Sequence, residues 1–326
     1  MKLYPLKFKT IFKDKIWGGQ KIKSVLGKEF APLPNCGETW ELSGVNENIS
    51  EVSNGALSGK LLTEIISEYG SDLLGSRVLK DYGSEFPLLI KFIDAADDLS
   101  IQVHPDNVLA KKRHNSFGKT EMWYIMQADE GATLISGFNT ELDRASYQKA
   151  FDEGKLNDIL NRELAEAGDV FFLPAGRVHT IGKGLLLAEI QQTSDVTYRI
   201  YDFDRKDAQG NLRELHLEES LDAIDYKKYD HYKTPYQPQK DKSVELAKCE
   251  YFFTNRLDLT GDMAVDHSGL DSFKIYICLS GKATISYEGG SESLEMGDVI
   301  LVPATMESYR IETTSGVNLL ETYIPN

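Results

Sequence analysis

Cysteine is scarce in this sequence. Only three of its 326 residues are cysteines, Cys36, Cys249 and Cys278, and they are scattered without paired spacing. This odd number, without paired spacing, argues against a disulfide framework and against a cysteine-based metal site. We therefore expect a protein of the reducing cytoplasm.

Long hydrophobic runs are missing as well. Residues 1–9 alternate apolar and basic side chains and lack the continuous apolar stretch of a signal peptide. No later run is long enough to span a bilayer. We expect a soluble, unsecreted protein that does not enter membranes.

Basic residues are outnumbered, with 36 Lys and Arg against 51 Asp and Glu, which gives a net charge of -15. A surface for nucleic acid or anionic membranes needs a basic face that releases counterions, so neither kind of partner is expected. A small anionic substrate remains compatible, because a few local cations can hold it. Lys119 and Arg199 are the candidates, since they lie near the metal-binding residues described next.

Three segments of the chain carry residues that bind metals. The string Gly-Asp-Val-Phe-Phe-Leu-Pro-Ala-Gly-Arg-Val-His at 168–179 has the spacing of a strand-turn-strand corner that ends in a histidine, His179. Gln102 and His104 are two residues apart, so on a strand they share one face, and Glu121 opens a further strand-like run. Two imidazoles, a carboxylate and an amide oxygen can converge on one divalent cation with room for substrate, as in catalytic metal sites. Gln102 is the weakest of the four, because a neutral amide is a poor ligand and could orient a ligand or bind substrate instead.

The chain is long enough for two domains. Helical spacing of apolar residues predicts helices at about 60–80, 141–164 and 214–225, and most of the remaining segments are typical of strands. The polar, proline-containing stretch 226–242 is typical of an exposed connector. We predict a metal-binding domain at 1–240 and an all-β domain at 241–326.

The two predicted domains share a short repeat. The segment 168–175, with the sequence Gly-Asp-Val-Phe-Phe-Leu-Pro-Ala, is repeated at 297–304 as Gly-Asp-Val-Ile-Leu-Val-Pro-Ala. This repeat indicates duplication of a fold element. The alignment places Ser308 opposite His179, and no second Gln-x-His with a following glutamate appears. The C-terminal domain is therefore expected to lack a metal.

These strings resemble the cupin superfamily and, more specifically, one family within it. The segment 168–179 matches the second cupin motif, although Lys183 stands where an asparagine often follows. Three further segments resemble the type I, zinc-dependent mannose-6-phosphate isomerase family. They are Leu-Ser-Ile-Gln-Val-His-Pro-Asp at 99–106, Lys-Thr-Glu-Met-Trp at 119–123 and the segment 189–199. The resemblance runs essentially from end to end. Members characteristically have His-Lys-Pro-Glu where residues 118–121 are Gly-Lys-Thr-Glu, and the large helical insertion of longer members is missing, as in the short bacterial form.

The resemblance implies a mainly β fold of two cupin-like jelly-roll barrels, with helical segments attached to the N-terminal one. It implies one zinc ion per chain held by His104, Glu121 and His179, with Gln102 as a fourth ligand or as a group that orients substrate. Arg199 is implied as a catalytic arginine, and Ser100 and Lys119 as contacts of a sugar phosphate.

The proton carrier is a separate question, because Glu189, Glu41 and Asp195 all offer carboxylates near these strings. Glu189 is favoured as the base, since it lies ten residues beyond His179 on an adjacent strand-like run. Trp17 and Trp40 are predicted to shape walls of the site.

The predicted activity is the interconversion of D-mannose 6-phosphate and D-fructose 6-phosphate through a metal-stabilised enediol-like state, with a phosphorylated hexose as the partner molecule. Two alternatives remain at this stage. The first is a cupin-type non-haem iron oxygenase, because two histidines and a carboxylate also form the facial triad of such enzymes. The second is a non-catalytic sugar-phosphate sensor, since a fold does not fix a function. The oligomeric state is open, as is the choice among zinc, manganese, cobalt and iron.

Overall fold

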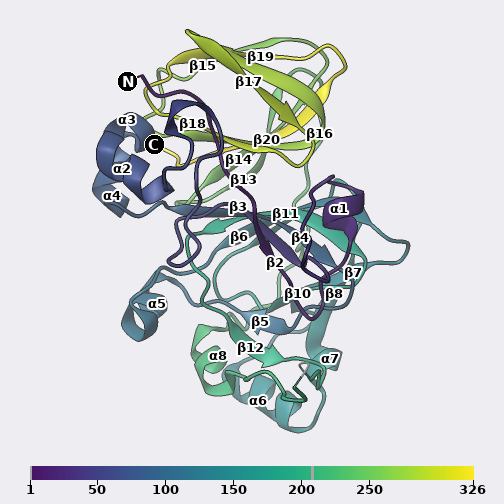
Figure 1. Ribbon diagram of the computed structural model, residues 1–326. Helices are drawn as coiled ribbons and strands as arrows, with labels where there is room; N and C mark the ends of the chain where they lie inside the picture. The colour runs from purple at the N-terminus through teal and green to yellow at the C-terminus, as the bar shows by residue number, and fades with distance from the viewer. Residues whose placement is uncertain (1, 207–208) are drawn as a thin grey trace.

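A computed structural model describes residues 2–206 and 209–326 and shows a mainly β protein built from three sheets (Figure 1). Two sheets face each other in the lower half of Figure 1, and the third forms the upper half. The predicted fold class is confirmed. None of the helices in the described residues is long and apolar enough to cross a membrane.

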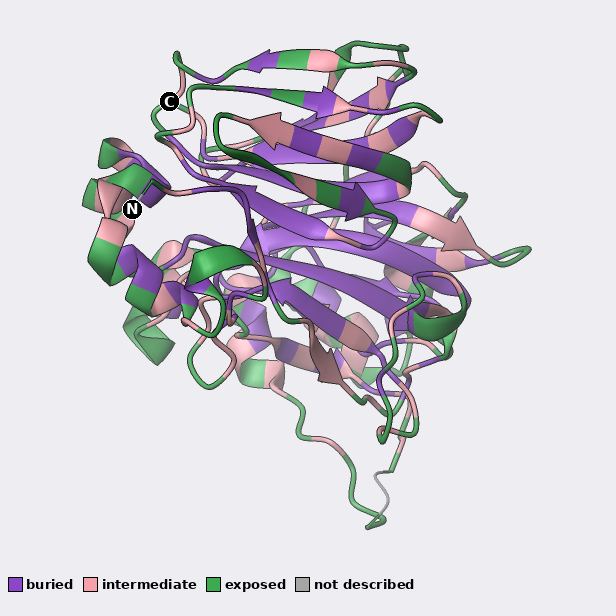
Figure 2. Cartoon of the chain, turned by 45° about the horizontal axis from the view of Figure 1, so that its top comes forward, coloured by how far each residue is buried: buried purple, intermediate pink, exposed green. Residues whose placement is uncertain are grey.

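The central sheet has six strands in the order β2-β3-β4-β11-β6-β9. Their bounds are β2 (Ile11–Lys13), β3 (Glu38–Leu42), β4 (Leu88–Ala95), β11 (Leu185–Gln192), β6 (Glu121–Ala128) and β9 (Val170–Leu173). Every residue of β4 and β11 is buried, and Figure 2 shows strands in the middle of the molecule that are coloured as buried along their length. Both faces of this sheet are covered, which explains why its strands read as nearly continuous apolar runs.

A five-stranded sheet faces the central one, in the order β12-β5-β10-β7-β8. Its strands are β12 (Tyr198–Tyr201), β5 (Ile101–Val103), β10 (His179–Ile181), β7 (Thr133–Phe138) and β8 (Leu160–Leu164). Apolar side chains of both sheets, among them Trp123, Leu134 and Ile181, form one core cluster. The space between these sheets also holds the candidate site.

The upper sheet contains the C-terminal strands. They are β13 (Ser243–Lys248), β14 (Phe253–Leu259), β15 (Met263–Asp266), β16 (Lys274–Tyr287), β17 (Gly290–Glu295), β18 (Val299–Val302), β19 (Ser308–Glu312) and β20 (Val317–Tyr323). The long β16 pairs with β18 through its first residues and with β17 and β19 through its last ones, so it belongs to both layers of a sandwich. The short β1 (Leu6–Lys7) pairs with β18, so the first described strand shares this sheet. A core cluster that includes Ile190 and Ile275 packs the upper sheet onto the central one.

Helices are short and surround the sheets. They are α1 (Lys21–Ser24), α2 (Leu62–Tyr69), α3 (Ser71–Leu74), α4 (Ser76–Tyr82), α5 (Asn107–His114), α6 (Arg144–Asp152), α7 (Leu156–Ile159) and α8 (Leu217–Ala223), with a 3-10 turn at Gly55–Leu57. The single helix predicted at 60–80 is wrong, because Gly70 (φ +48°) and Gly75 (φ +91°) divide it into α2, α3 and α4. The single helix predicted at 141–164 is also wrong, because α6 ends at Asp152, a separate short helix α7 follows, and residues 160–164 pair with β7 as strand β8.

Helix α4 is capped by a residue from the C-terminal part of the chain. The Asp271 carboxylate accepts hydrogen bonds from the backbone N–H groups of Ser76 (2.7 Å) and Arg77 (2.9 Å). Without this cap both N–H groups lack an acceptor in the helix. We expect Asp271→Ala to lower the free energy of unfolding by about 1–2 kcal/mol, measured by urea denaturation. Asp271→Asn keeps one acceptor oxygen and should lose less, whereas equal unfolding midpoints for all three proteins would contradict this role.

Candidate metal centre and its cavity

The central sheet carries charged residues where strand alternation turns side chains toward the five-stranded sheet. Lys91 on β4 and Glu189 on β11 are register partners, and Trp123 on β6 is the next partner in the same row. The Glu189 carboxylate lies 2.9 Å from the Lys91 ammonium and accepts a hydrogen bond of 2.8 Å from the Trp123 indole N–H. Buried charges are stable only when they are paired or hydrogen-bonded. This paired row is therefore typical of a functional site and not of a purely structural sheet.

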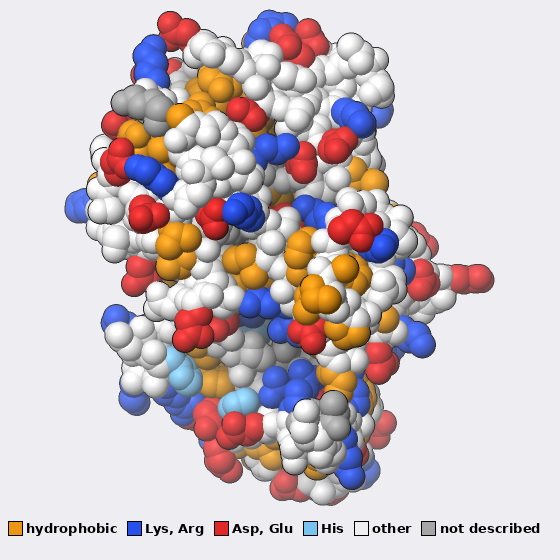
Figure 3. All heavy atoms as spheres, viewed as in Figure 1, with side chains coloured by type: hydrophobic (Ala, Val, Ile, Leu, Met, Phe, Trp, Pro, Cys, Tyr) orange, Lys and Arg blue, Asp and Glu red, His pale blue; other side chains and the backbone are white. Residues whose placement is uncertain are grey.

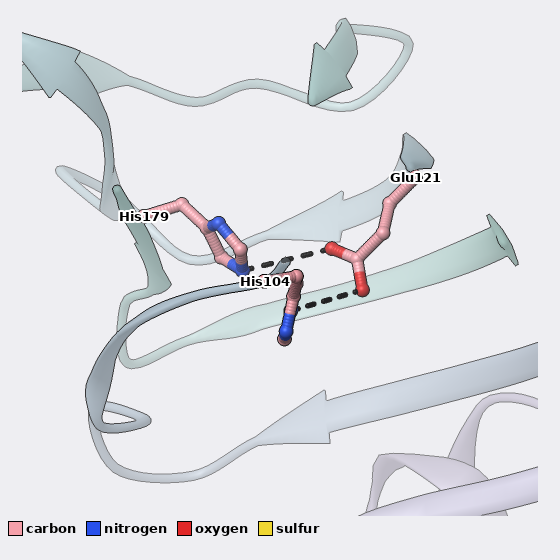
Figure 4. A group of neighbouring side chains, drawn as sticks. All are labelled: His104, Glu121 and His179. Atoms are coloured by element: carbon pink, nitrogen blue, oxygen red, sulfur yellow. Dashed lines mark ion pairs between the residues drawn. The ribbon is translucent and has the colours of Figure 1, made fainter. Parts of the chain in front are cut away.

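Three potential metal ligands converge beside this row (Figure 4). His179 is the first residue of β10, Glu121 is the first residue of β6, and His104 directly follows β5. The Glu121 carboxylate approaches His104 Nε2 at 3.3 Å and His179 Nε2 at 3.6 Å, and the three candidate ligand atoms lie within 4.8 Å of one another. All three side chains are almost fully buried.

Both imidazoles are held so that Nε2 faces the carboxylate. His104 Nδ1 donates to the Val196 carbonyl at 2.9 Å, and His179 Nδ1 donates to the Arg177 carbonyl at 2.8 Å. A histidine that donates through Nδ1 offers its Nε2 lone pair, which is the arrangement of metal-binding histidines. His104 Nε2 and Glu121 Oε2 are buried and have no hydrogen-bond partner among the described residues. These donors fit a divalent cation.

The charge states of the three residues also suit a cation. Burial, reinforced by the Lys119 ammonium, lowers the pKa of His104 to about 3, and burial lowers the pKa of His179. Burial alone would raise the pKa of Glu121, but Lys119 and His104 outweigh it and hold that pKa well below its usual range. At neutral pH the group therefore offers two neutral imidazoles and one carboxylate, the protonation states that metal binding requires.

Gln102, Ser100 and Lys119 border this group. Gln102 is the register partner of His179, and its side-chain Nε2 lies 3.3 Å from His179 Nε2, while Ser100 Oγ donates to Gln102 Oε1 at 3.4 Å. Turning the amide by about 180° exchanges its oxygen and nitrogen, so Gln102 can present either atom. Lys119 Nζ lies 3.3 Å from Glu121. Direct coordination by Gln102 stays a prediction.

Glu121, one member of this group, lines a cavity of about 440 Å³. This size lies within the range of small-molecule sites. Its lining includes Ser100, Gln102, Lys119, Glu121, Glu189, Arg199, Trp17, Trp40 and Asp195, and also Lys13, Lys15, Glu38, Lys91 and Arg213. On the face shown in Figure 3, Lys and Arg side chains gather around a hollow below the middle of the molecule. The cavity is thus more basic than the acidic chain as a whole.

Five of these lining residues were not predicted from the sequence: Lys13, Lys15, Glu38, Lys91 and Arg213. Lys91 lies in a mostly apolar run of β4, between Ile90 and Phe92, and a charge within such a buried run is a signal that could have found it. Glu38 accepts from the Trp40 indole at 2.8 Å and pairs with Lys15 at 3.3 Å. Burial alone would raise the pKa of Glu38, but Lys91 and Lys15 lower it to about 2.

Arg199 lies on β12, in register with Gln102, on the opposite wall from Lys91. Its Nη1 donates to the Glu214 carbonyl at 2.7 Å, and its backbone N–H donates to His216 Nδ1 at 3.2 Å. Its buried Nε has no hydrogen-bond partner among the described residues. Because a guanidinium carries five N–H donors, Arg199 keeps donors free for an anionic ligand.

The repeat seen in the sequence corresponds to equivalent strands. In the repeat, Leu173 corresponds to Val302. Leu173 pairs with Glu121 in the central sheet, and Val302 pairs with Lys274 in the upper sheet. An ammonium thus stands at the position of the Glu121 carboxylate. Likewise β10 begins at His179, and β19 begins at Ser308.

The fold and the site together define a cupin-type protein with a candidate metal centre. Two family models match the chain: phosphomannose isomerase type I, catalytic domain, at residues 5–136, and mannose-6-phosphate isomerase, cupin domain, at residues 242–318. A mannose-6-phosphate isomerase of Streptococcus mutans is 34% identical over 94% of this chain and 95% of its own length. The chain belongs to the type I mannose-6-phosphate isomerase family.

Further relatives agree along nearly the whole chain. The mannose-6-phosphate isomerase ManA of Bacillus subtilis is 34% identical over 94% of this chain and 96% of its own length. A crystal structure of a mannose 6-phosphate isomerase from Bacillus subtilis superposes with a TM-score of 0.88 at 32% identity, covering 98% of this chain and 99% of that one. The resemblance inferred from the sequence is confirmed.

Proposed function

We propose that the protein is a metal-dependent aldose-ketose isomerase that interconverts D-mannose 6-phosphate and D-fructose 6-phosphate. One observation carries this proposal: Glu121, which belongs to the His104-Glu121-His179 group, lines the same cavity as Arg199, whose Nε has no hydrogen-bond partner among the described residues. The group would hold a cation, and Arg199 can bind negative charge on the substrate. The relatives are mannose-6-phosphate isomerases, which favours this activity over an iron oxygenase or a sugar-phosphate sensor.

We propose one zinc ion per chain, held by His104, Glu121 and His179, with Gln102 as a fourth ligand. Two imidazoles and a carboxylate are a common catalytic zinc set, although manganese, cobalt and iron accept the same donors. When bound, the cation supplies Lewis-acid stabilisation of negative charge on the sugar oxygens. The three free cysteines fit the reducing cytoplasm, which is the location we propose.

The chain's own residues account for the remaining chemistry. Isomerisation moves a proton between the first two sugar carbons, and negative charge develops on their oxygens. Arg199 and Lys119 are cations fixed in the cavity and stabilise that charge, since preorganised charges need no rearrangement during the reaction. Ser100 contributes a hydroxyl that can bind a substrate oxygen.

Glu189 is the proposed proton carrier. Burial, followed by the charge of Glu121, raises the pKa of Glu189 and so brings a carboxylate closer to the range useful for proton transfer. Its contacts with Lys91 and Trp123 fix both oxygens at the cavity wall. The alternative carboxylate Glu41 pairs with Lys28 at 3.0 Å and lies outside the residues that line the cavity.

We expect Glu189→Gln to lower kcat by about 10²–10⁴-fold, because the amide keeps the shape but cannot carry the proton. Zinc content should not change. Glu41→Gln is the matched control, since Glu41 is also buried and paired with a lysine, and it should keep the wild-type kcat. Equal kcat values for both variants in steady-state assays would remove Glu189 from the mechanism.

Substrate comparison tests the proposed activity. Zinc-loaded protein should convert mannose 6-phosphate to fructose 6-phosphate, and it should use unphosphorylated mannose with a much lower kcat/KM, because the phosphate supplies binding energy that positions the sugar. Oxygen consumption by the iron-loaded protein without isomerisation would favour the oxygenase. Tight binding of mannose 6-phosphate without turnover would favour the sensor.

A further inference from the structure

The corner between β9 and β10, residues 174–178, contacts both candidate metal-binding histidines through its backbone. The Gly176 N–H donates to the His104 carbonyl at 2.9 Å. One residue later, the Arg177 carbonyl accepts the Nδ1 hydrogen bond of His179 at 2.8 Å. A shift of this corner therefore moves one histidine backbone and turns the other imidazole.

The Arg177 side chain is held in an unusual way for a buried cation. It is 6% exposed, and it forms no ion pair with a carboxylate of the described residues. Instead, its guanidinium carbon lies 4.4 Å from the ring centre of Tyr229 and 4.8 Å from that of Tyr232. Because burial of an uncompensated charge is costly, the two aromatic faces determine where Arg177 can lie.

Both tyrosines come from the stretch 226–242 that the sequence indicated as an exposed connector, but Tyr232 is buried. The Tyr232 hydroxyl donates to the Phe138 carbonyl at 2.7 Å and accepts from the Phe138 N–H at 3.1 Å, which fixes the ring on β7. The Tyr229 hydroxyl donates to the Asp225 carboxylate at 2.6 Å, and the Asp225 N–H donates to the Gly176 carbonyl at 2.8 Å. The two tyrosines of the connector thus contact the Arg177 side chain, and Asp225, the residue just before the connector, holds the Gly176 backbone.

We propose that Arg177, packed against the rings of Tyr229 and Tyr232, is a positioning residue for the metal ligands His104 and His179. Partners outside the ligand set orient metal-binding histidines and strengthen metal binding. The connector thereby sets the metal affinity of a site to which it contributes no ligand. This inference rests on the proposed function only for the metal, not for the sugar.

Zinc affinity of the metal-free protein, measured by competition with a chromophoric chelator, tests the proposal. Arg177→Met and Tyr229→Leu remove the guanidinium and one aromatic face, and each should weaken zinc binding by about 10–100-fold. Tyr229→Phe keeps the ring but loses the hydrogen bond to Asp225, so its zinc affinity should lie between that of Tyr229→Leu and that of the wild type. Tyr236→Leu is the matched control, because Tyr236 is a tyrosine of the same connector whose ring contacts Arg256 and not Arg177.

Thermal unfolding of the same metal-free proteins separates positioning from general stability. If Arg177→Met and Tyr229→Leu lower Tm but bind zinc like the wild type, the proposal is overturned. Should either variant fail to fold, Arg177→Lys replaces it; the lysine keeps the charge but loses the planar stacking, so it should still weaken zinc binding. Unchanged affinity in Arg177→Lys would also overturn the proposal.

The same wild-type preparation is assayed for mannose 6-phosphate turnover. If the wild type does not isomerise while zinc affinities follow the expected order, the proposed function fails and the positioning role stands. If the wild type isomerises and all variants bind zinc equally, the positioning role alone fails.

Discussion

His179→Ala is expected to abolish both zinc binding and turnover. His179 is buried and its Nε2 lies 3.6 Å from Glu121, so the substitution removes one of the three convergent ligand atoms. Loss of the Lewis acid removes several kcal/mol of stabilisation, so kcat/KM should fall by at least about 10³-fold. Metal content by elemental analysis and steady-state kinetics measure the two effects.

The control for this variant is His231→Ala, because His231 is exposed and far in sequence from the candidate ligands. It should keep both metal and activity. If His179→Ala retained one equivalent of zinc and full turnover, the proposed ligand set would be wrong.

The second large effect is expected for Arg199→Ala. Removal of one preorganised cation that faces the developing charge should lower kcat by about 10²–10³-fold. Zinc content should stay at one equivalent, because Arg199 supplies none of the convergent ligand atoms. The backbone hydrogen bonds between Arg199 and His216 do not need the side chain and should hold the strand in place.

Arg199→Lys keeps the positive charge without the planar fork of donors and should recover part of the lost kcat. Separate values of kcat and KM show whether Arg199 acts on the transition state or on binding in general. Loss of zinc from Arg199→Ala would instead mean that the arginine is structural.

The residues with local signals were predictable from the sequence. Gln102 and His104 share a strand face two residues apart, and the glycine and proline spacing before His179 marks a corner. The fold brings His104, Glu121 and His179 together as that pattern indicated. The proposed catalytic roles, and the division into domains at 1–240 and 241–326, stay predictions.

Residues that depend on long-range register were not predictable in the same way. Lys91 joins the site because β4 pairs with β11 at Glu189, and nothing near Lys91 in sequence indicates that pairing. The breaks at Gly70 and Gly75 were hidden by apolar spacing that continues in phase across α2, α3 and α4. Tyr229 and Tyr232 appeared as polar connector residues, since their partner Arg177 is far away along the chain.

The central claim is that one divalent cation in the His104-Glu121-His179 group supports sugar-phosphate isomerisation. A coupled assay for fructose 6-phosphate formed from mannose 6-phosphate tests it most directly, run on untreated, chelator-treated and zinc-restored protein. The account predicts turnover that disappears with chelation and returns with zinc. Full turnover after complete metal removal, or none in the zinc-loaded protein, would contradict it.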